Sequence, residues 1–251
     1  NPELRVFNLT HEIETYNIWN ASYRLVQTLQ YWPEGTVFVS VVDPGVGSER
    51  KSVVAKTKDG KYIVTPNNGT LTHIHLNIGI EEIREIDETK NRLPYSNDSY
   101  TFHGRDIYAF TGARLATGVI SYEEVGPKLD LEEISLLNTG EVKIENGNTI
   151  QGTIDILDVR FGNLWTNIPK EDFENLGIKY GDTVELTINH DSRKVYSSTV
   201  KYVKSFSEVN TGATLLYVNS LHKIGVAINQ GSFSKAHQVD SGYQWKVEFK
   251  K

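Results

Sequence analysis

Three short polar loops carry residue types that could do chemistry, and each follows an apolar run. They are Asp43-Pro44-Gly45-Val46-Gly47-Ser48-Glu49-Arg50, Pro66-Asn67-Asn68-Gly69-Thr70 and Thr101-Phe102-His103-Gly104-Arg105-Asp106. A carboxylate paired with an arginine stays ionised, and an imidazole moves protons near neutral pH. Asp43, Arg50 and His103 therefore supply the parts of a water-activating site.

Each of these loops also has a purely structural interpretation. Asp43 can cap a turn, Arg50 can form a surface ion pair and His103 can cap a helix, since such constellations also arise by chance. Asn67-Asn68-Gly69 can offer amide groups to a ligand, but it is also a common turn composition. Asp106 could join His103 as a metal ligand. One histidine with scattered carboxylates lacks the ligand spacing of a zinc site, so we expect no metal.

The elements expected around the first loop form a βαβ unit. An apolar stretch over Leu4–Leu9 predicts a strand, and the apolar spacing from Ile18 to Leu29 predicts a helix that stops at Tyr31-Trp32-Pro33. The continuous apolar run Val37–Val42 is typical of a strand buried on both faces of a parallel sheet. Asp43 then lies at the carboxyl end of that strand, where ligands bind in open α/β sheets.

The other two loops have predicted neighbours as well. Val53–Lys56 and Tyr62–Thr65 flank Asp59-Gly60, which is a strong hairpin signal, so the sheet is expected to be mixed and mostly parallel. Apolar spacing after His103 predicts a helix that ends at Gly118. His103 should therefore lie just ahead of a helix N-terminus.

The second half of the chain changes character. Residues 136–149 are polar and rich in Gly and Asn, which predicts a linker between a first domain at 1–140 and a second at 149–251. Beyond it, apolar residues alternate with period two, as in Val184–Ile188 and Val200–Val203, so this domain should be mostly antiparallel β. A short helix is expected after Pro169.

The second domain also carries candidate binding residues. The stretch Asp158–Asn167 offers a carboxylate, the aromatic ring of Phe161 and the carboxamide of Asn163, which suit an amine and a heteroaromatic base. Asn219-Ser220 and Ala227–Gly231 could bind a carboxylate or an adenine edge through backbone groups. Both stretches are equally compatible with an ordinary strand and loop.

Composition indicates which partners and which cellular compartment to expect for this protein. The 251 residues carry a net charge of -6, so nucleic acid is not an expected partner. No apolar run reaches the roughly 20 residues that span a membrane, and we expect a soluble protein. The chain has no cysteine, which fits a reducing compartment, so we expect the cytoplasm. It also has no methionine, not even an initiator, and we expect its natural start to lie upstream.

Five motifs, in this order on the two halves, resemble the S-adenosylmethionine hydroxide adenosyltransferase family, which is related to the 5′-fluorinases and 5′-chlorinases. The motifs are VVDPGVGSER, PNNGTLT, TFHGRDIYA, FGNLWTNI and INQGSF. The resemblance implies an N-terminal α/β domain and a C-terminal β-barrel-like domain, assembled as a homotrimer with active sites between subunits. It also implies attack by water or hydroxide at ribose C5′, releasing adenosine and L-methionine without a metal or cofactor.

The same resemblance assigns roles to single residues. Asp43, Arg50 and His103 match the family's water-activating triad. The substrate-binding positions that it implies are Tyr16 near the ribose, Asp158 and Ser220 at the methionine end, and Phe161, Asn163 and Phe206 at the adenine. Asn68 and Asn229 are further candidates for substrate binding, from the polar loops in which they lie. The family carries an Asp that grips the ribose diol on a strand and helix upstream of where this chain starts. Halogenases replace the aspartate of the DPG turn, so Asp43 and Val46 argue against a halide site.

Three alternatives remain at this point. A 5′-halogenase would form a halogenated nucleoside, and a non-catalytic S-adenosylmethionine sensor would bind without turnover. A metal-dependent phosphohydrolase would be built on Asp43, Asn68, His103 and Asp106, and would lose activity on chelation.

Overall fold

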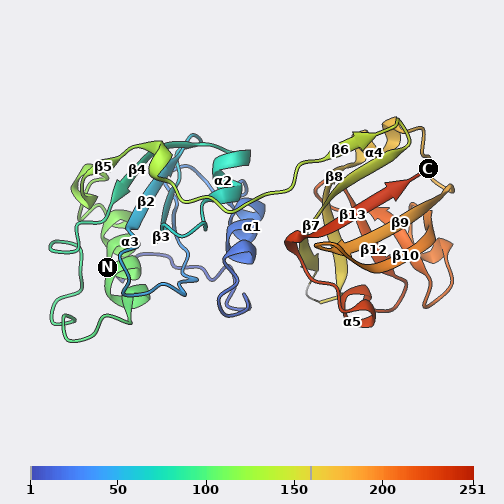
Figure 1. The fold of residues 1–251 in the computed structure, drawn as a ribbon. Coiled ribbons are helices and arrows are strands. Elements are labelled where there is room, and N and C mark those ends of the chain that lie inside the picture. The colour runs from blue at the N-terminus through green and yellow to red at the C-terminus, as the bar shows by residue number, and fades with distance from the viewer. Residues whose placement is uncertain (1, 159) are drawn as a thin grey trace. The chain divides into compact units, whose positions relative to one another are not determined.

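The computed structural model describes residues 2–158 and 160–251. Within it the chain forms two compact units, one ending at Leu137 and the other spanning Asn138–Lys251 (Figure 1). The division between them falls inside the polar stretch 136–149. Each unit has its own hydrophobic core.

The first unit is built on a five-stranded mixed sheet in the order β1-β3-β2-β4-β5. Its strands are β1 (Val37–Val39), β2 (Ser52–Thr57), β3 (Tyr62–Pro66), β4 (Ile80–Glu85) and β5 (Lys128–Leu129). The α/β class and the mixed sheet are confirmed. Only β1 and β3 pair in parallel, and the other three pairings are antiparallel, a larger antiparallel share than the sequence predicted. The reason is the Asp59-Gly60 hairpin between β2 and β3, after which β4 runs back along β2.

Helices cover both faces of this sheet (Figure 1). One face packs on α1 (Ile18–Leu29) and α2 (Thr72–Asn77), and the other packs on the π-helix η1 (Gly104–Ala109) and on α3 (Phe110–Ala116). Successive β2 side chains therefore enter different cores, which is why an apolar run was needed there rather than an alternating one. Two 3₁₀ turns, η2 (Glu123–Val125) and η3 (Leu131–Glu133), flank β5.

The predicted strand over Leu4–Leu9 is wrong. This segment has no regular secondary structure, and its side chains at Val6 and Phe7 are 80% and 57% exposed. A strand is stable only when a neighbour satisfies its backbone groups, and no described strand pairs with this segment. The helix from Ile18 and the turn after it are confirmed.

The second unit is a closed seven-stranded barrel with an eighth strand attached. The barrel is closed by pairing of β13 with β7, and β10 and β11 form its one parallel pairing among the described strands. Its strands are β6 (Lys143–Glu145), β7 (Thr149–Asp158), β8 (Asn163–Pro169), β9 (Thr183–His190), β10 (Arg193–Tyr202), β11 (Thr214–Val218), β12 (Lys223–Ile228) and β13 (Gly242–Lys250). The expected antiparallel, barrel-like domain is confirmed.

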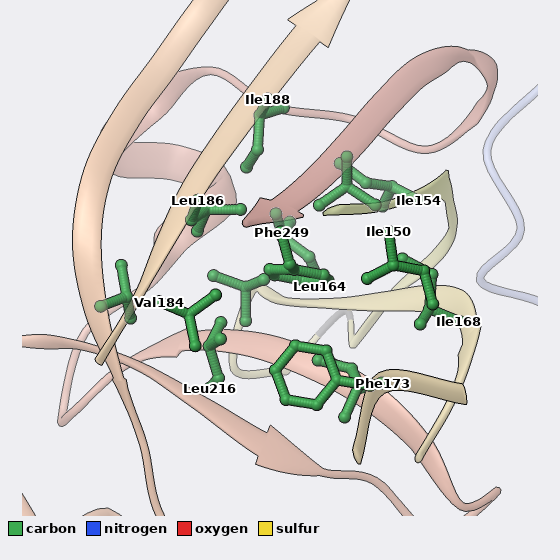
Figure 2. Packing of buried hydrophobic residues seen from close by; sticks show 14 of the residues in the cluster. Ile150, Ile154, Leu164, Ile168, Phe173, Val184, Leu186, Ile188, Leu216 and Phe249 are labelled. Atoms are coloured by element: carbon green, nitrogen blue, oxygen red, sulfur yellow. The ribbon is translucent and has the colours of Figure 1, made fainter. Parts of the chain in front are cut away.

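Alternating residues of these strands fill the barrel. Figure 2 shows Ile154, Leu164, Leu186 and Phe249 pointing from different strands into one interior. The predicted helix after Pro169 is α4 (Lys170–Asn175), and the remaining short helices are η4 (Phe206–Glu208) and α5 (Phe233–His237). Across residues 2–158 and 160–251, no helix combines the length and the apolar character needed to cross a bilayer.

Candidate active site

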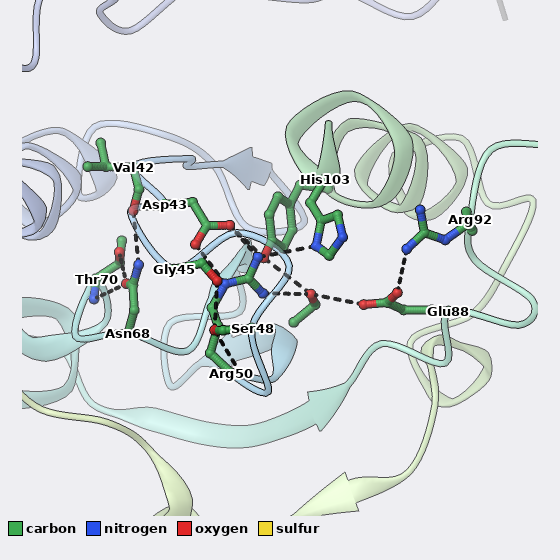
Figure 3. A network of polar contacts seen from close by, with 12 residues as sticks. Val42, Asp43, Gly45, Ser48, Arg50, Asn68, Thr70, Glu88, Arg92 and His103 are labelled. Atoms are coloured by element: carbon green, nitrogen blue, oxygen red, sulfur yellow. Dashed lines mark hydrogen bonds and ion pairs between the residues drawn. The ribbon is translucent and has the colours of Figure 1, made fainter. Parts of the chain in front are cut away.

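The structure brings the three residues of the predicted triad together (Figure 3). Arg50 Nε donates to Asp43 Oδ1 at 2.6 Å, and Arg50 Nη2 pairs with Asp43 Oδ2. The same Nη2 lies 3.2 Å from His103 Nδ1. The side chains of Asp43 and Arg50 are 6% and 10% exposed, so this is a nearly buried charge pair and not a surface ion pair.

A glycine and two side-chain hydrogen bonds fix the conformation of the loop that carries Asp43. Gly47 has φ +79°, and a Cβ there would lie 3.1 Å from the Tyr100 carbonyl oxygen, so glycine suits both the conformation and the space. Ser48 Oγ donates to the Gly45 carbonyl at 2.7 Å and closes the turn. Asn68 Nδ2 donates to the Val42 carbonyl at 2.9 Å, which ties the loop after β3 to the residue that precedes Asp43.

The contact with Arg50 determines the tautomer of His103. A guanidinium has only donors, so Nδ1 must accept its hydrogen bond and the proton of the neutral ring lies on Nε2. His103 is 6% exposed, and Nε2 has no hydrogen-bond partner among the described residues. The site therefore contains a buried N–H donor that is free to bind an oxygen.

The charge state of His103 is also set by its surroundings. Burial lowers its pKa below the ordinary value of 6.5, while the Glu88 carboxylate raises the pKa and the Arg50 guanidinium lowers it. The folded protein therefore binds this proton less tightly than the unfolded chain does. The resulting stability is present above about pH 6.5 and is lost as the pH falls through the lower pKa of the folded state.

We expect Glu88→Gln to lower the pKa of His103 further, because the substitution removes the negative charge that favours the imidazolium. NMR titration of the His103 ring measures this shift. Glu81→Gln is the control, since Glu81 forms an exposed pair with Lys56 and should leave the His103 midpoint unchanged. A midpoint that rises in Glu88→Gln would contradict this account of the site.

Two of the three residues predicted to hold the adenine, Asn163 and Phe206, lie near Tyr217 in the barrel. The Tyr217 hydroxyl accepts a hydrogen bond from Trp165 Nε1 at 2.9 Å, and the Asn163 side chain lies near the same hydroxyl. The Phe206 ring lies 5.1 Å from the Tyr217 ring. Asn163 is 6% exposed, and its Oδ1 has no partner within the described chain. This surface therefore presents a buried acceptor beside aromatic rings.

Tyr217 was missed by the sequence analysis, although one signal was present. Gly225 faces Tyr217 across the β11–β12 pairing, and a Cβ at Gly225 would lie 2.6 Å from the tyrosine ring. A glycine inside an apolar strand often marks the close approach of another group. The ring that approaches it could not be identified from the sequence, because it depends on which strands pair.

Other predicted substrate residues lie apart from these clusters. Tyr16 precedes α1 with φ +71° and is 73% exposed, while Phe161 is 63% exposed in the loop between β7 and β8. Ser220 is exposed in the turn between β11 and β12. Asn229 donates from Nδ2 to the Val209 carbonyl and so holds a neighbouring loop. In the DVRFGNLWTN stretch of Asp158, Val159 lies outside the described residues.

The residues on which a metal-dependent phosphohydrolase would be built do not form one cluster. Asp106 is fully buried and pairs with Arg105, and the Asn68 amide bonds Val42 and Thr70. In the described ranges, no group of three or more His, Cys, Asp or Glu side chains is arranged to hold a metal ion.

Comparison with known proteins identifies the family of this chain. Residues 1–126 match the SAM hydroxide adenosyltransferase N-terminal domain, and residues 152–246 match the C-terminal domain. The chain is 35% identical to a Methanocaldococcus jannaschii protein named (R)-S-adenosyl-L-methionine hydrolase, over 96% of this chain and 81% of the relative. It is 26% identical to a fluorinase of Actinopolyspora mzabensis, over 98% and 87% of the two chains.

A solved structure has the same fold as this chain. An uncharacterized conserved protein from Thermotoga maritima superposes with a TM-score of 0.87 at 35% identity, covering 100% of this chain and 90% of the other. The two matched domains together cover most of the sequence. This chain therefore belongs to the SAM hydroxide adenosyltransferase family.

Proposed function

We propose that this chain is an enzyme that hydrolyses S-adenosyl-L-methionine to adenosine and L-methionine. The observation that carries the proposal is the Asp43–Arg50–His103 cluster with a free Nε2–H donor, in a chain of this family. Relatives named (R)-S-adenosyl-L-methionine hydrolase support the same reaction and suggest the R epimer at sulfur as the substrate.

The proposed reaction requires the protein mainly to position the nucleophile and the substrate. Water oxygen forms a bond to C5′ as the C5′–S bond breaks, and the electron pair of that bond neutralises the sulfonium to give methionine. One proton leaves the attacking water. Because the sulfonium is already an activated leaving group, catalysis depends on holding the nucleophile about 3–3.5 Å from C5′ and excluding other water. No metal or cofactor is needed for this proposal.

Asp43 and His103 have complementary roles toward that water. The Nε2–H of His103 donates to the water oxygen, and Asp43 Oδ1, which keeps a lone pair beside its bond from Arg50 Nε, accepts a water hydrogen. His103 in this tautomer cannot be the base at Nε2. The leaving proton therefore passes toward Asp43, and His103 orients the oxygen.

Substrate contacts are proposed on the second unit. Asn163 Oδ1, a buried acceptor, suits the exocyclic amine of adenine, while Phe161 and Phe206 offer rings for stacking. Asp158 and Ser220 are proposed to hold the methionine end, and Tyr16 to approach the ribose. Asn68 and Asn229 are proposed to support the loops that line the substrate.

We also propose a homotrimer in the cytoplasm, with each site formed by the first unit of one subunit and the second unit of its neighbour. Mixing Asp43→Asn subunits with Asn163→Ala subunits tests the site arrangement. If sites form between subunits, mixed trimers contain some intact sites and regain activity. If each site lies within one chain, every site stays damaged, and the mixture is no more active than its components.

The test of the function is incubation with each sulfonium epimer separately, in halide-free buffer with excess chelator, followed by chromatography with mass detection. Adenosine and methionine in equal amounts are the expected products. Parallel reactions with chloride or fluoride test the halogenase alternative, which is relevant because some relatives are named fluorinase. Binding without product would instead indicate a sensor, and activity lost to chelator would indicate the metal-dependent reaction.

Asn163→Ala is expected to weaken substrate binding by about 1–3 kcal/mol, because an adenine amine would lose its acceptor. Calorimetry with the slow Asp43→Asn background measures the affinity. Asn167→Ala is the matched control on the same strand, since its amide already bonds Thr153 and Gly140 within the chain. Equal affinities for Asn163→Ala and its parent would remove Asn163 from the site.

A further inference from the structure

Tyr108 is a buried residue that the proposed reaction does not yet use. It is 0% exposed and lies in η1, five residues after His103. In an α-helix, with 3.6 residues per turn, residues five apart point in different directions. The wider i→i+5 turn of a π-helix brings them toward the same side, and such turns are frequent at functional sites. The irregular helix thus gives Tyr108 access to the triad.

Tyr108 contacts both charged members of the triad. Its hydroxyl lies 3.5 Å from Asp43 Oδ2, which is a long hydrogen bond, and 3.2 Å from Ser52 Oγ. Arg50 Nη1 donates to the same Ser52 oxygen at 3.1 Å. The Arg50 guanidinium carbon also lies 5.6 Å from the centre of the Tyr108 ring, within cation–π range.

Each hydroxyl hydrogen in this network can be assigned to an acceptor without conflict. Ser52 Oγ accepts from Arg50 and donates to Glu88 Oε1 at 3.4 Å, and Glu88 in turn accepts from Arg92 at 2.7 Å (Figure 3). The Tyr108 hydrogen is then available to Asp43 or Ser52. Burial raises the pKa of Tyr108 far above its usual range, so the hydroxyl remains a donor across the working pH range.

We propose that Tyr108 is a positioning residue, which holds the Asp43 carboxylate and the Arg50 guanidinium in one geometry through its hydroxyl, its ring and Ser52. The inference rests on the proposed function, because the geometry that it maintains is the one that orients the attacking water. Tyr108 itself does not contact that water. Its effect should therefore fall on the rate of the chemical step and not on substrate affinity.

Tyr108→Phe tests this directly, since it removes the hydroxyl and keeps the ring. The matched control is Tyr122→Phe, because Tyr122 is 7% exposed, packs in the same core and donates to the Val54 and Glu82 carbonyls, away from the triad. We expect kcat to fall by about 10–100-fold in Tyr108→Phe with KM within about threefold of the parent. Tyr122→Phe should keep both constants within about twofold, whatever its melting temperature.

A second readout needs no turnover. The His103 ring resonances of the free protein should move in Tyr108→Phe and stay in place in Tyr122→Phe. If the parent protein hydrolyses no S-adenosyl-L-methionine, the proposed function fails, and this comparison alone decides the positioning role. Unchanged His103 resonances in Tyr108→Phe, or equal rate losses in both variants, would overturn it. Should Tyr108→Phe not fold, Ser52→Ala is measured in the same two ways and must show the same loss and the same shift.

Discussion

Asp43→Asn is expected to lower kcat for S-adenosyl-L-methionine hydrolysis by about 10²–10⁴-fold, the range that a lost acid–base group usually produces. The substitution keeps the size of the side chain and removes its charge. It also replaces one of two acceptor oxygens with an NH₂ donor, which would face the donor-only guanidinium of Arg50. The variant therefore loses both the acceptor for the water proton and the geometry of the pair.

Substrate affinity should be largely unchanged in Asp43→Asn, because the proposed adenine and methionine contacts come from other residues. Steady-state kinetics and calorimetry separate the two effects. Asp59→Asn is the control, since Asp59 pairs with Lys61 at the β2–β3 turn, where the loss of charge should not alter kcat. A kcat for Asp43→Asn within threefold of the parent would remove Asp43 from catalysis and favour a binding protein or a different reaction centre.

Arg50→Lys is expected to lower kcat by about 10²-fold or more, even though the positive charge is kept. Three nitrogens of Arg50 make separate contacts, with Asp43, Ser52 and His103, and their spacing depends on the planar guanidinium. A lysine ammonium is a single point of charge and cannot reach all three partners. The Asp43 carboxylate and the His103 ring would lose their common anchor.

The stability of Arg50 variants supplies a second measurement. Arg50→Ala leaves the carboxylate of Asp43 buried without its partner, and we expect the free energy of unfolding to fall by about 3–5 kcal/mol in urea titrations. Arg84→Lys is the control for the lysine substitution, because Arg84 is also largely buried but bonds Glu82 and stacks on Tyr122. Normal activity in Arg50→Lys would show that charge alone suffices and that the planar group is not required.

Much of the local structure followed from the sequence. Asp59-Gly60 predicted the hairpin of β2 and β3, and the helix at Ile18–Leu29 was predicted from its apolar spacing. The segment Leu4–Leu9 has the right apolar character but no strand beside it among the described residues. The strand expected over Val37–Val42 ends at Val39 and lies at the edge of the sheet, so it is not buried on both faces and Asp43 follows it in a loop. Propensity is local and could not show this, because a strand is completed by residues far away in the sequence.

The candidate site divides in the same way. The residues that could act were identifiable from the sequence, since Asp43, Arg50 and His103 stand in loops that follow apolar runs and match the family motifs. Three further features became visible in the folded chain: the three side chains meet, His103 carries its proton on Nε2, and Tyr108 and Tyr217 belong to the two clusters. Turn residues and apolar periodicity act over a few neighbouring positions. A tautomer or a ring contact, by contrast, is set by whichever distant side chain folding brings within hydrogen-bond reach.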